Sequence, residues 1–120
     1  MSAVKSFEEL EVWKNARLFC KAVYDQTNNV DFNKDFGLKD QIRRASISVV
    51  SNIAEGFERE TDKEFGRFLY IAKASAGEVR AQLYIAYDLN YIDTESFEDL
   101  KEKITVISKM ISKFITYLKY

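Results

Sequence analysis

The feature that most constrains this chain is a repeated spacing of apolar residues in alternating steps of three and four. Two such rows are long, and they span Phe65 to Ala86 and Phe97 to Leu118. A period near 3.5 residues places each row on one face of an α-helix. Two long amphipathic helices are therefore predicted, with apolar faces made by Phe65, Leu69, Ala72, Ala76, Val79, Leu83 and Ala86, and by Phe97, Leu100, Ile104, Ile107, Ile111, Phe114 and Leu118.

Two further helices are predicted in the first half of the chain. Ser6 and Glu9 have the spacing of a capping box, which marks the start of the first helix. Asn28 and Asn29 are expected to end that helix, and residues 30–36 are expected to be irregular. A second helix is then predicted from Gly37 to about Phe57. The apolar row of the first helix is predicted to be Trp13, Ala16, Cys20, Val23 and Thr27.

Capping residues also mark the starts of the two later helices. Thr61 and Glu64 form a second capping box, and Asp93 or Thr94 caps the last helix. The chain contains no proline and 4 glycines, so few positions force a helix to stop. Four helices joined by short polar turns predict an all-α fold, an up-down-up-down antiparallel four-helix bundle that forms a single domain over residues 1–120.

Composition excludes several broad classes of protein. The chain is 47% hydrophobic, which is enough to build a core, and its 18 basic and 19 acidic residues give a net charge of −1. No overall positive field attracts nucleic acid or membrane, so any such contact is expected to be local. The N-terminus lacks a secretory pattern, and a cytoplasmic, soluble protein without membrane contact is expected. The lone Cys20 is expected to be a small buried apolar residue in a reduced compartment.

Enzyme chemistry is not expected. The chain has no histidine, so it lacks the usual general base, imidazole metal ligands and any Ser-His or Cys-His nucleophile. The four glycines, at positions 37, 56, 66 and 77, match neither a phosphate loop nor a dinucleotide fingerprint. We therefore predict no catalytic site, no metal, no cofactor and no small-molecule substrate.

Two helices carry more apolar surface than a monomeric bundle needs. On a helical wheel, the apolar and small residues of the 37–57 helix cover roughly 200°, whereas an ordinary surface helix needs a stripe of about 100°. The 61–88 helix carries a second row, away from its core row, that combines tyrosines with small residues. Scattered surface residues are the alternative interpretation. We predict a homo-oligomer with an interface that includes Tyr70, Ala74, Gly77, Ala81, Tyr84, Val50 and Ala54.

Polar residues of the 37–57 helix suggest a second kind of contact. Arg43 falls inside the apolar arc, so it is expected either to reach water or to find a carboxylate partner, and a buried pair would make its loss cost roughly 3–5 kcal/mol. A polar row on the remaining face predicts a network at a subunit junction; its alternative is a solvated face. The predicted buried polar network comprises Arg43, Arg44, Asn52, Glu55 and Glu78.

Two groups of basic residues are candidates for nucleic-acid contact. Arg59, Lys63 and Arg67 cluster around the start of the 61–88 helix, although four acidic residues interleave with them. Residues 100–120 contain five lysines, at positions 101, 103, 109, 113 and 119, against the single acid Glu102. Either group could contact phosphates, and a solvated helix face is the alternative.

Several motifs resemble one known family. They are Leu10-Glu11-Val12-Trp13-Lys14, then Gly37-Leu38 with Gln41-Ile42-Arg43-Arg44-Ala45, then Ser51-Asn52-Ile53-Ala54-Glu55-Gly56, and then Glu64-Phe65, Phe68-Leu69, Ile71-Ala72 and Glu78. Together they resemble the bacterial four-helix-bundle family of 23S rRNA intervening-sequence proteins. The resemblance implies a reading frame of the type found within insertions in 23S rRNA genes, and a homopentamer with a central channel.

The chain departs from that family at two places. Family members often carry proline where Val50 stands and another near Asp31, so the resemblance implies a straighter second helix and a looser preceding turn here. The fold is also similar to that of the accessory variability protein of diversity-generating retroelements, a basic pentamer that binds RNA and a reverse transcriptase. The slightly acidic balance of this chain differs from those basic proteins.

Two functions from different classes follow. The first is a non-enzymatic homo-oligomeric scaffold that binds RNA, or an RNA-associated protein, with Arg59, Lys63 and Arg67 as the expected nucleic-acid contacts. The second is a protein-protein interaction scaffold without a nucleic-acid role, in which Tyr70, Tyr84 and Tyr117 contact the partner.

Overall fold

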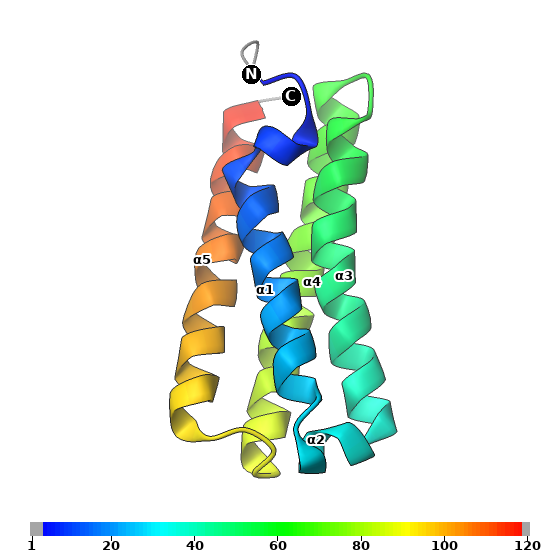
Figure 1. Ribbon diagram of the computed structural model, residues 1–120. Helices are drawn as coiled ribbons and strands as arrows, with labels where there is room; N and C mark the ends of the chain where they lie inside the picture. The colour runs from blue at the N-terminus through cyan, green and yellow to red at the C-terminus, as the bar shows by residue number, and fades with distance from the viewer. Residues whose placement is uncertain (1–3, 119–120) are drawn as a thin grey trace.

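Four long helices run alternately up and down in the computed structural model, each antiparallel to the next along the chain (Figure 1). The structure describes residues 4–118. They are α1 (Glu11–Thr27), α3 (Phe36–Phe57), α4 (Asp62–Asp88) and α5 (Thr94–Leu118). A 3₁₀ turn, η1 (Phe7–Glu9), precedes α1, and a short helix, α2 (Val30–Lys34), connects α1 to α3. The bundle measures 45 × 21 × 20 Å. The predicted all-α, up-down-up-down fold is confirmed.

The apolar rows predicted for α4 and α5 form most of the core on their side of the bundle. Every member of the Phe65–Ala86 core row of α4 is buried. Six of the seven members of the Phe97–Leu118 core row of α5 are buried as well, and the seventh, Phe114, is half-buried. Ile53 of α3, Leu69 and Val79 of α4 and Ile111 of α5 are 0% exposed. Fully burying such a side chain contributes about 1.5–3 kcal/mol, so the packing of these rows holds the four helices together.

The first helix begins later than predicted. Ser6 does not cap α1; its hydroxyl instead donates to a Glu9 carboxylate oxygen at 3.3 Å. Leu10 then adopts an extended backbone, with φ −73° and ψ 125°, and its side chain enters the core. This extended residue ends η1, and α1 starts at Glu11.

The buried face of α1 is also rotated from the predicted row. Trp13 and Cys20 are only half-buried, whereas the core side chains are Val12, Ala16, Phe19, Val23 and Thr27. Partial burial raises the pKa of the Cys20 thiol. Trp13 lies at the edge of the core, where its ring also meets Phe7 of η1 at a centroid distance of 5.0 Å.

The segment after α1 is helical rather than irregular, which corrects the prediction for residues 30–36. The Asn29 side chain accepts a hydrogen bond from the Phe32 backbone N–H at 2.9 Å and so caps α2. Phe32 is buried against Tyr91, with ring centroids 5.3 Å apart. The turn is thus packed against the second half of the chain through Phe32.

The same segment is fastened to the turn between α4 and α5. The Asn29 amide donates to the Tyr91 carbonyl at 2.7 Å, and the Tyr91 hydroxyl donates to an Asp35 carboxylate oxygen at 2.9 Å. We call Asn29, Phe32, Asp35 and Tyr91 the Tyr91 clasp. Asp35 also accepts a hydrogen bond from the Leu38 N–H, so α3 begins at Phe36 and not at Gly37.

Thr61 caps α4 and Asp93 caps α5, as predicted, although the Glu64 carboxylate binds Arg67 and does not complete the predicted capping box. The Thr61 hydroxyl accepts from the Glu64 N–H at 3.1 Å, and the Asp93 carboxylate accepts from the Ser96 N–H at 2.7 Å. Of the two candidate caps for α5, Asp93 is therefore the one used. Helix α3 runs unbroken through Val50, as expected for a chain without proline there.

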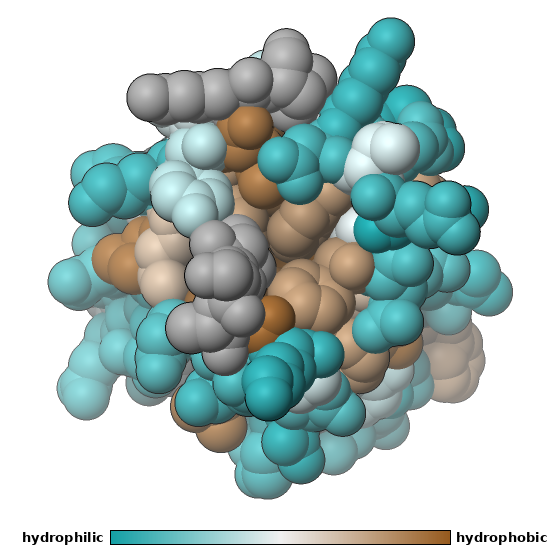
Figure 2. Space-filling view, turned by 90° about the horizontal axis from the view of Figure 1, so that it is seen from above, coloured by the Kyte–Doolittle hydropathy of each residue, from teal (hydrophilic) through white to brown (hydrophobic). Residues whose placement is uncertain are grey.

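The bundle has two different ends. Figure 2 looks onto the end that carries the chain termini and shows hydrophobic side chains gathered near its middle, with hydrophilic side chains around the rim. The Tyr91 clasp lies at the opposite end, beside α2 (Figure 1). Across residues 4–118, no helix combines the length and apolar character needed to cross a membrane.

Candidate functional site

The outer face of α4 carries the row of tyrosines and small residues predicted from the sequence. We call Tyr70, Ala74, Gly77, Ala81 and Tyr84 the α4 row. All five are exposed, Tyr70 by 54% and Tyr84 by 47%, and a Cβ added at Gly77 would have no atom within 4 Å. The protomer therefore does not cover this row.

Two aliphatic residues extend the apolar surface of α4 beyond the predicted row. Ile71 is 39% exposed and Ile85 is 48% exposed. They are fourteen residues apart, close to four helical turns, and therefore lie on one face of α4. The sequence analysis missed them, although this spacing would have identified them.

Val50 and Ala54 do not lie beside the α4 row. Both are half-buried, and Ala54 lines a hollow that also includes Phe7 of η1. Gly56, by contrast, marks the side of α3 that faces α4, where it contacts Phe65 and Phe68. The membership of Val50 and Ala54 in an oligomer interface stays a prediction. These two residues and the α4 row lie on separate surfaces of the protomer.

Arg43 is half-buried, and its partners are neutral groups in place of the carboxylate that was one of its two predicted arrangements. Its Nε donates to the Thr27 hydroxyl at 2.8 Å, and its Nη2 donates to the Asn28 side-chain oxygen at 3.0 Å. The guanidinium carbon also lies 4.3 Å from the centroid of the Tyr24 ring. Within the described residues it forms no ion pair with a carboxylate. Arg43 thus connects the end of α1 to α3 through neutral partners.

The other members of the predicted polar network are separated in the protomer. Asn52 donates to the backbone oxygen and hydroxyl of Ser48, at 2.9 and 3.0 Å, whereas Arg44 pairs with Asp40 at 2.9 Å on the surface. Glu55 is exposed. Within the described part of the chain, Arg43, Arg44, Asn52, Glu55 and Glu78 therefore do not form one buried network. Their predicted burial at a subunit junction stays a prediction.

A polar contact between α3 and α4 was missed by the sequence analysis. The hydroxyl groups of Ser48 and Ser75 are 2.8 Å apart, and Ser75 is buried. Gln82 is 5% exposed; its amide donates to exposed Glu78 at 3.3 Å, and its Oε1 has no partner among the described residues. Small polar residues at core spacing carry no distinct signal, which is why the pattern did not identify this contact.

The basic residues at the turn between α3 and α4 gather around one aromatic ring. The guanidinium carbons of Arg59 and Arg67 lie 4.6 and 4.9 Å from the centroid of Phe68, and Lys63 is exposed nearby in sequence. Arg67 also binds both carboxylate oxygens of Glu64, at 3.2 and 3.3 Å, and this contact lowers the pKa of Glu64. Two of the three predicted nucleic-acid contacts are thus brought together.

The lysines of α5 point to several sides of the bundle. Lys101 pairs with Glu98 at 3.6 Å and Lys103 pairs with Asp99 at 2.9 Å, whereas Lys109 and Lys113 are exposed. Lys119 lies outside the described residues. The four described lysines therefore do not form one patch.

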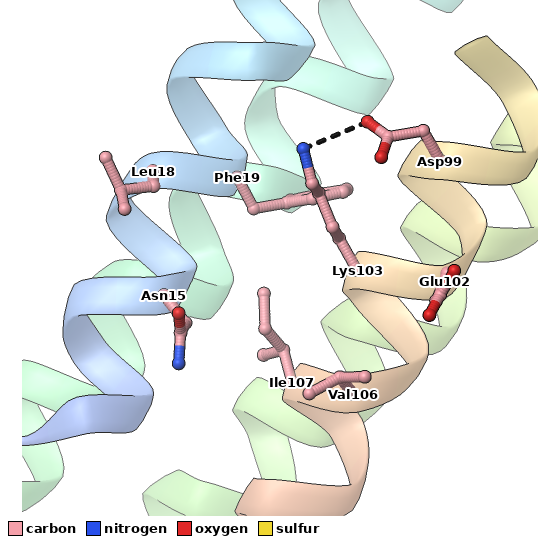
Figure 3. A pocket seen from close by; sticks show the side chains of 8 residues that line it. All are labelled: Asn15, Leu18, Phe19, Asp99, Glu102, Lys103, Val106 and Ile107. Atoms are coloured by element: carbon pink, nitrogen blue, oxygen red, sulfur yellow. Dashed lines mark ion pairs between the residues drawn. The ribbon is translucent and has the colours of Figure 1, made fainter. Parts of the chain in front are cut away.

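A hollow between α1 and α5 was not anticipated. It encloses about 380 Å³, and Leu18 and Val106, at 66% and 47% exposure, stand at its edges (Figure 3). The Asp99–Lys103 ion pair spans its upper part. The residues that line the hollow are Asn15, Leu18, Phe19, Asp99, Glu102, Lys103, Val106 and Ile107.

Residues 4–118 contain no group of three His, Cys, Asp or Glu side chains arranged to hold a metal ion.

Comparison with known proteins gives one family and one close fold. The sequence model of the 23S rRNA-intervening sequence protein family matches residues 8–113. A solved structure from Bacteroides thetaiotaomicron, described as a protein with unknown function from the S23 ribosomal protein family, is similar with a TM-score of 0.80 and 27% sequence identity. The similarity covers 87% of this chain and 97% of that one. No curated protein matches the chain.

Proposed function

Because the chain belongs to the 23S rRNA-intervening sequence protein family, we propose that it is a non-enzymatic scaffold that self-associates and binds RNA in the cytoplasm. In this proposal α4 provides the contact between subunits, with a homopentamer as the expected assembly. The turn between α3 and α4 provides basic side chains for RNA.

The exposed α4 row is the observation that carries the proposal. Tyr70 and Tyr84 present large amphipathic rings, and Gly77 between them leaves the helix backbone open to close approach. Aromatic residues are enriched at protein interfaces because they bury much area with few rotatable bonds. Ile71 and Ile85 widen this apolar surface. Such a surface supports contact with a second copy of the chain.

The basic turn supports the RNA part of the proposal. Arg59 and Arg67 are held against Phe68, which restricts their side chains before any ligand arrives. A ring of subunits would repeat these residues around its axis, so that several weak phosphate contacts act together. The net charge of −1 means that such local repetition, and not the overall field, must supply the affinity.

The proposal is tested by measuring the mass of the purified protein by light scattering and its affinity for labelled 23S rRNA fragments at several salt concentrations. We expect a multiple of the protomer mass and an affinity that falls steeply with salt. The variant R59E/K63E/R67E should stay folded but lose RNA retention, with a small fall in melting temperature from the lost contact between Arg67 and Glu64. A monomer, or no RNA binding at low salt, would contradict the proposal.

A protein partner is the second candidate, and the exposure of three tyrosines favours it. Tyr70, Tyr84 and Tyr117 are 54%, 47% and 56% exposed. If the oligomer forms but fails to bind RNA at low salt, these residues become the place to seek a protein contact.

A further inference from the structure

The outer surface between α4 and α5 combines basic and hydroxyl side chains. Three contacts show which residues of α4 and α5 lie side by side. Tyr84 meets Phe97, and Phe65 meets Phe114, each at a centroid distance of 5.0 Å. The Lys101 ammonium lies 5.7 Å from the centroid of the Tyr84 ring. Arg80 lies about one turn from Tyr84 and Lys73 lies two turns further along α4. Lys109 lies about two turns beyond Lys101 on α5. We call this surface the α4–α5 face and define it by Lys73, Arg80, Tyr84, Lys101, Thr105, Ser108 and Lys109.

The charges of this face are largely uncompensated. Lys73, Arg80 and Lys109 are exposed and form no ion pair with any described residue. Lys101 has one carboxylate partner among the described residues, Glu98, at 3.6 Å. The turn between α3 and α4 differs, because Arg67 is held by Glu64 and acidic residues alternate with basic ones along residues 58–64. Unpaired cations attract phosphates more strongly than cations already paired with carboxylates.

The uncharged groups of the face suit a polynucleotide strand. Tyr84 is 47% exposed at the end of the face nearest Phe97. An exposed aromatic ring can stack with an unpaired base of any identity, whereas a duplex keeps its bases stacked on each other. Ser108 is half-buried and offers a hydroxyl group between the lysines of α5. From Lys73 to Tyr84 the face extends about 17 Å along α4.

We propose that a single RNA strand lies along the α4–α5 face, with its phosphates on Lys73, Arg80 and Lys109 and an unpaired base on Tyr84. This inference rests on the proposed RNA-binding function and assigns it a second site and a strand preference. The α4 row and the α4–α5 face share Tyr84, so this proposal requires that Tyr84 stay exposed at the edge of the subunit contact.

Salt dependence of RNA binding tests the phosphate contacts directly. Each phosphate neutralised on a single strand contributes about −0.7 to the slope of log affinity against log salt concentration. The variant K73Q/R80Q/K109Q should therefore bind labelled single-stranded RNA with a slope shallower by about 2. The control K14Q/K21Q/K34Q removes the same number of exposed charges from α1 and α2 and should leave the slope unchanged.

The outcomes separate this inference from the function on which it rests. If the unmodified protein binds no RNA at low salt, the proposed function fails. If it binds, but K73Q/R80Q/K109Q keeps the slope of the control, this site is wrong and the RNA function stands. The unmodified protein should also bind a single strand more tightly than a duplex of the same sequence; equal or tighter duplex binding would overturn the strand assignment.

Discussion

Two glycines on adjacent helices show how differently the inside and the outside of this bundle are built. A Cβ at Gly56 of α3 would lie 2.8 Å from the Phe68 Cβ and 2.9 Å from the Phe65 ring of α4. A Cβ at Gly77 of α4 would meet no atom within 4 Å. Both glycines carry the usual cost of about 1 kcal/mol relative to alanine within a helix. Only the packing of Gly56 offsets that cost in the protomer.

Contacts within the protomer explain why glycine is needed at one of these positions but not at the other. Gly56 is needed because α3 and α4 approach closely beside two phenylalanines. Gly77 serves no contact within the described residues, and its neighbours Tyr70, Ala74, Ala81 and Tyr84 are exposed as well. The proposed assembly would give Gly77 the kind of close contact that Gly56 has inside the protomer. Substitutions can test this difference.

The largest effect is expected at Gly56. Gly56→Val should lower the free energy of unfolding by at least about 3 kcal/mol, because overpacking typically costs 1–3 kcal/mol and a branched side chain would meet both the Phe68 Cβ and backbone. Chemical denaturation measures this change. The free energy of unfolding of Gly56→Ala should lie between those of Gly56→Val and the unmodified protein. A stability loss below 1 kcal/mol for the valine variant would show that α3 and α4 separate easily, and the contrast with Gly77 would disappear.

An intermediate effect is expected at Arg43, another position that the protomer explains. Arg43→Ala should destabilise by about 1.5–3 kcal/mol, because it removes charged hydrogen bonds and leaves the buried Thr27 hydroxyl without this partner. This is smaller than the 3–5 kcal/mol predicted for a buried ion pair, since no such pair is present among the described residues. Thermal and urea melts measure it.

Arg44 is the matched control for that variant. Its ion pair with Asp40 joins side chains that are 79% and 63% exposed, and exposed pairs contribute at most about 1 kcal/mol. Equal effects of Arg43→Ala and Arg44→Ala would refute the role of Arg43 as a connection between α1 and α3.

A smaller effect of opposite sign is expected at Gly77. Gly77→Ala should stabilise the isolated protomer by about 0.5–1 kcal/mol, because alanine favours the helix and has room there. The same variant should lower the mass measured by light scattering at a given concentration, if α4 forms the subunit contact. An unchanged mass would remove Gly77 from the interface and leave its occurrence unexplained.

The smallest effect is expected for an exposed contact at the start of α4. The hydrogen bond from Arg67 is the main cause that lowers the pKa of Glu64. A lowered folded pKa stabilises the protein above the ordinary glutamate pKa, and this contribution is lost as pH falls through the folded value. Glu64→Gln should therefore flatten the stability profile in that acidic window only. Identical slopes for both proteins through that window, or a stability difference that persists unchanged below it, would show that the contact is not formed.

How much was predictable depends on whether a feature is local in sequence. The core rows of α4 and α5 and the caps at Thr61 and Asp93 follow from spacing and side-chain chemistry within a few residues, and they were predicted. The start of α1 was not, because Leu10 leaves the helix to enter the core. Whether Leu10 is helical or extended depends on the core that the other helices form. The α2 helix likewise depends on Tyr91, about sixty residues away.

The candidate site divides in the same way. The α4 row could be read from its periodicity, since exposure follows from lying opposite the core row of the same helix. The partners of Arg43 could not be predicted from the sequence, because Thr27 and Asn28 carry no charge that marks them as partners for a cation. The hollow between α1 and α5 also has no sequence signal, because it depends on the distance between two helices at opposite ends of the chain.

The Tyr91 clasp has a consequence for how the chain could be divided. Two of its hydrogen bonds join the first half of the chain, at Asn29 and Asp35, to the second half at Tyr91. A cut in the turn at residues 58–61 would give two helical hairpins, and each would expose an apolar face that the other normally covers. Neither fragment should fold alone, but the two should recognise each other when mixed. The contacts of the Tyr91 clasp would then help the two fragments to bind each other in the correct arrangement.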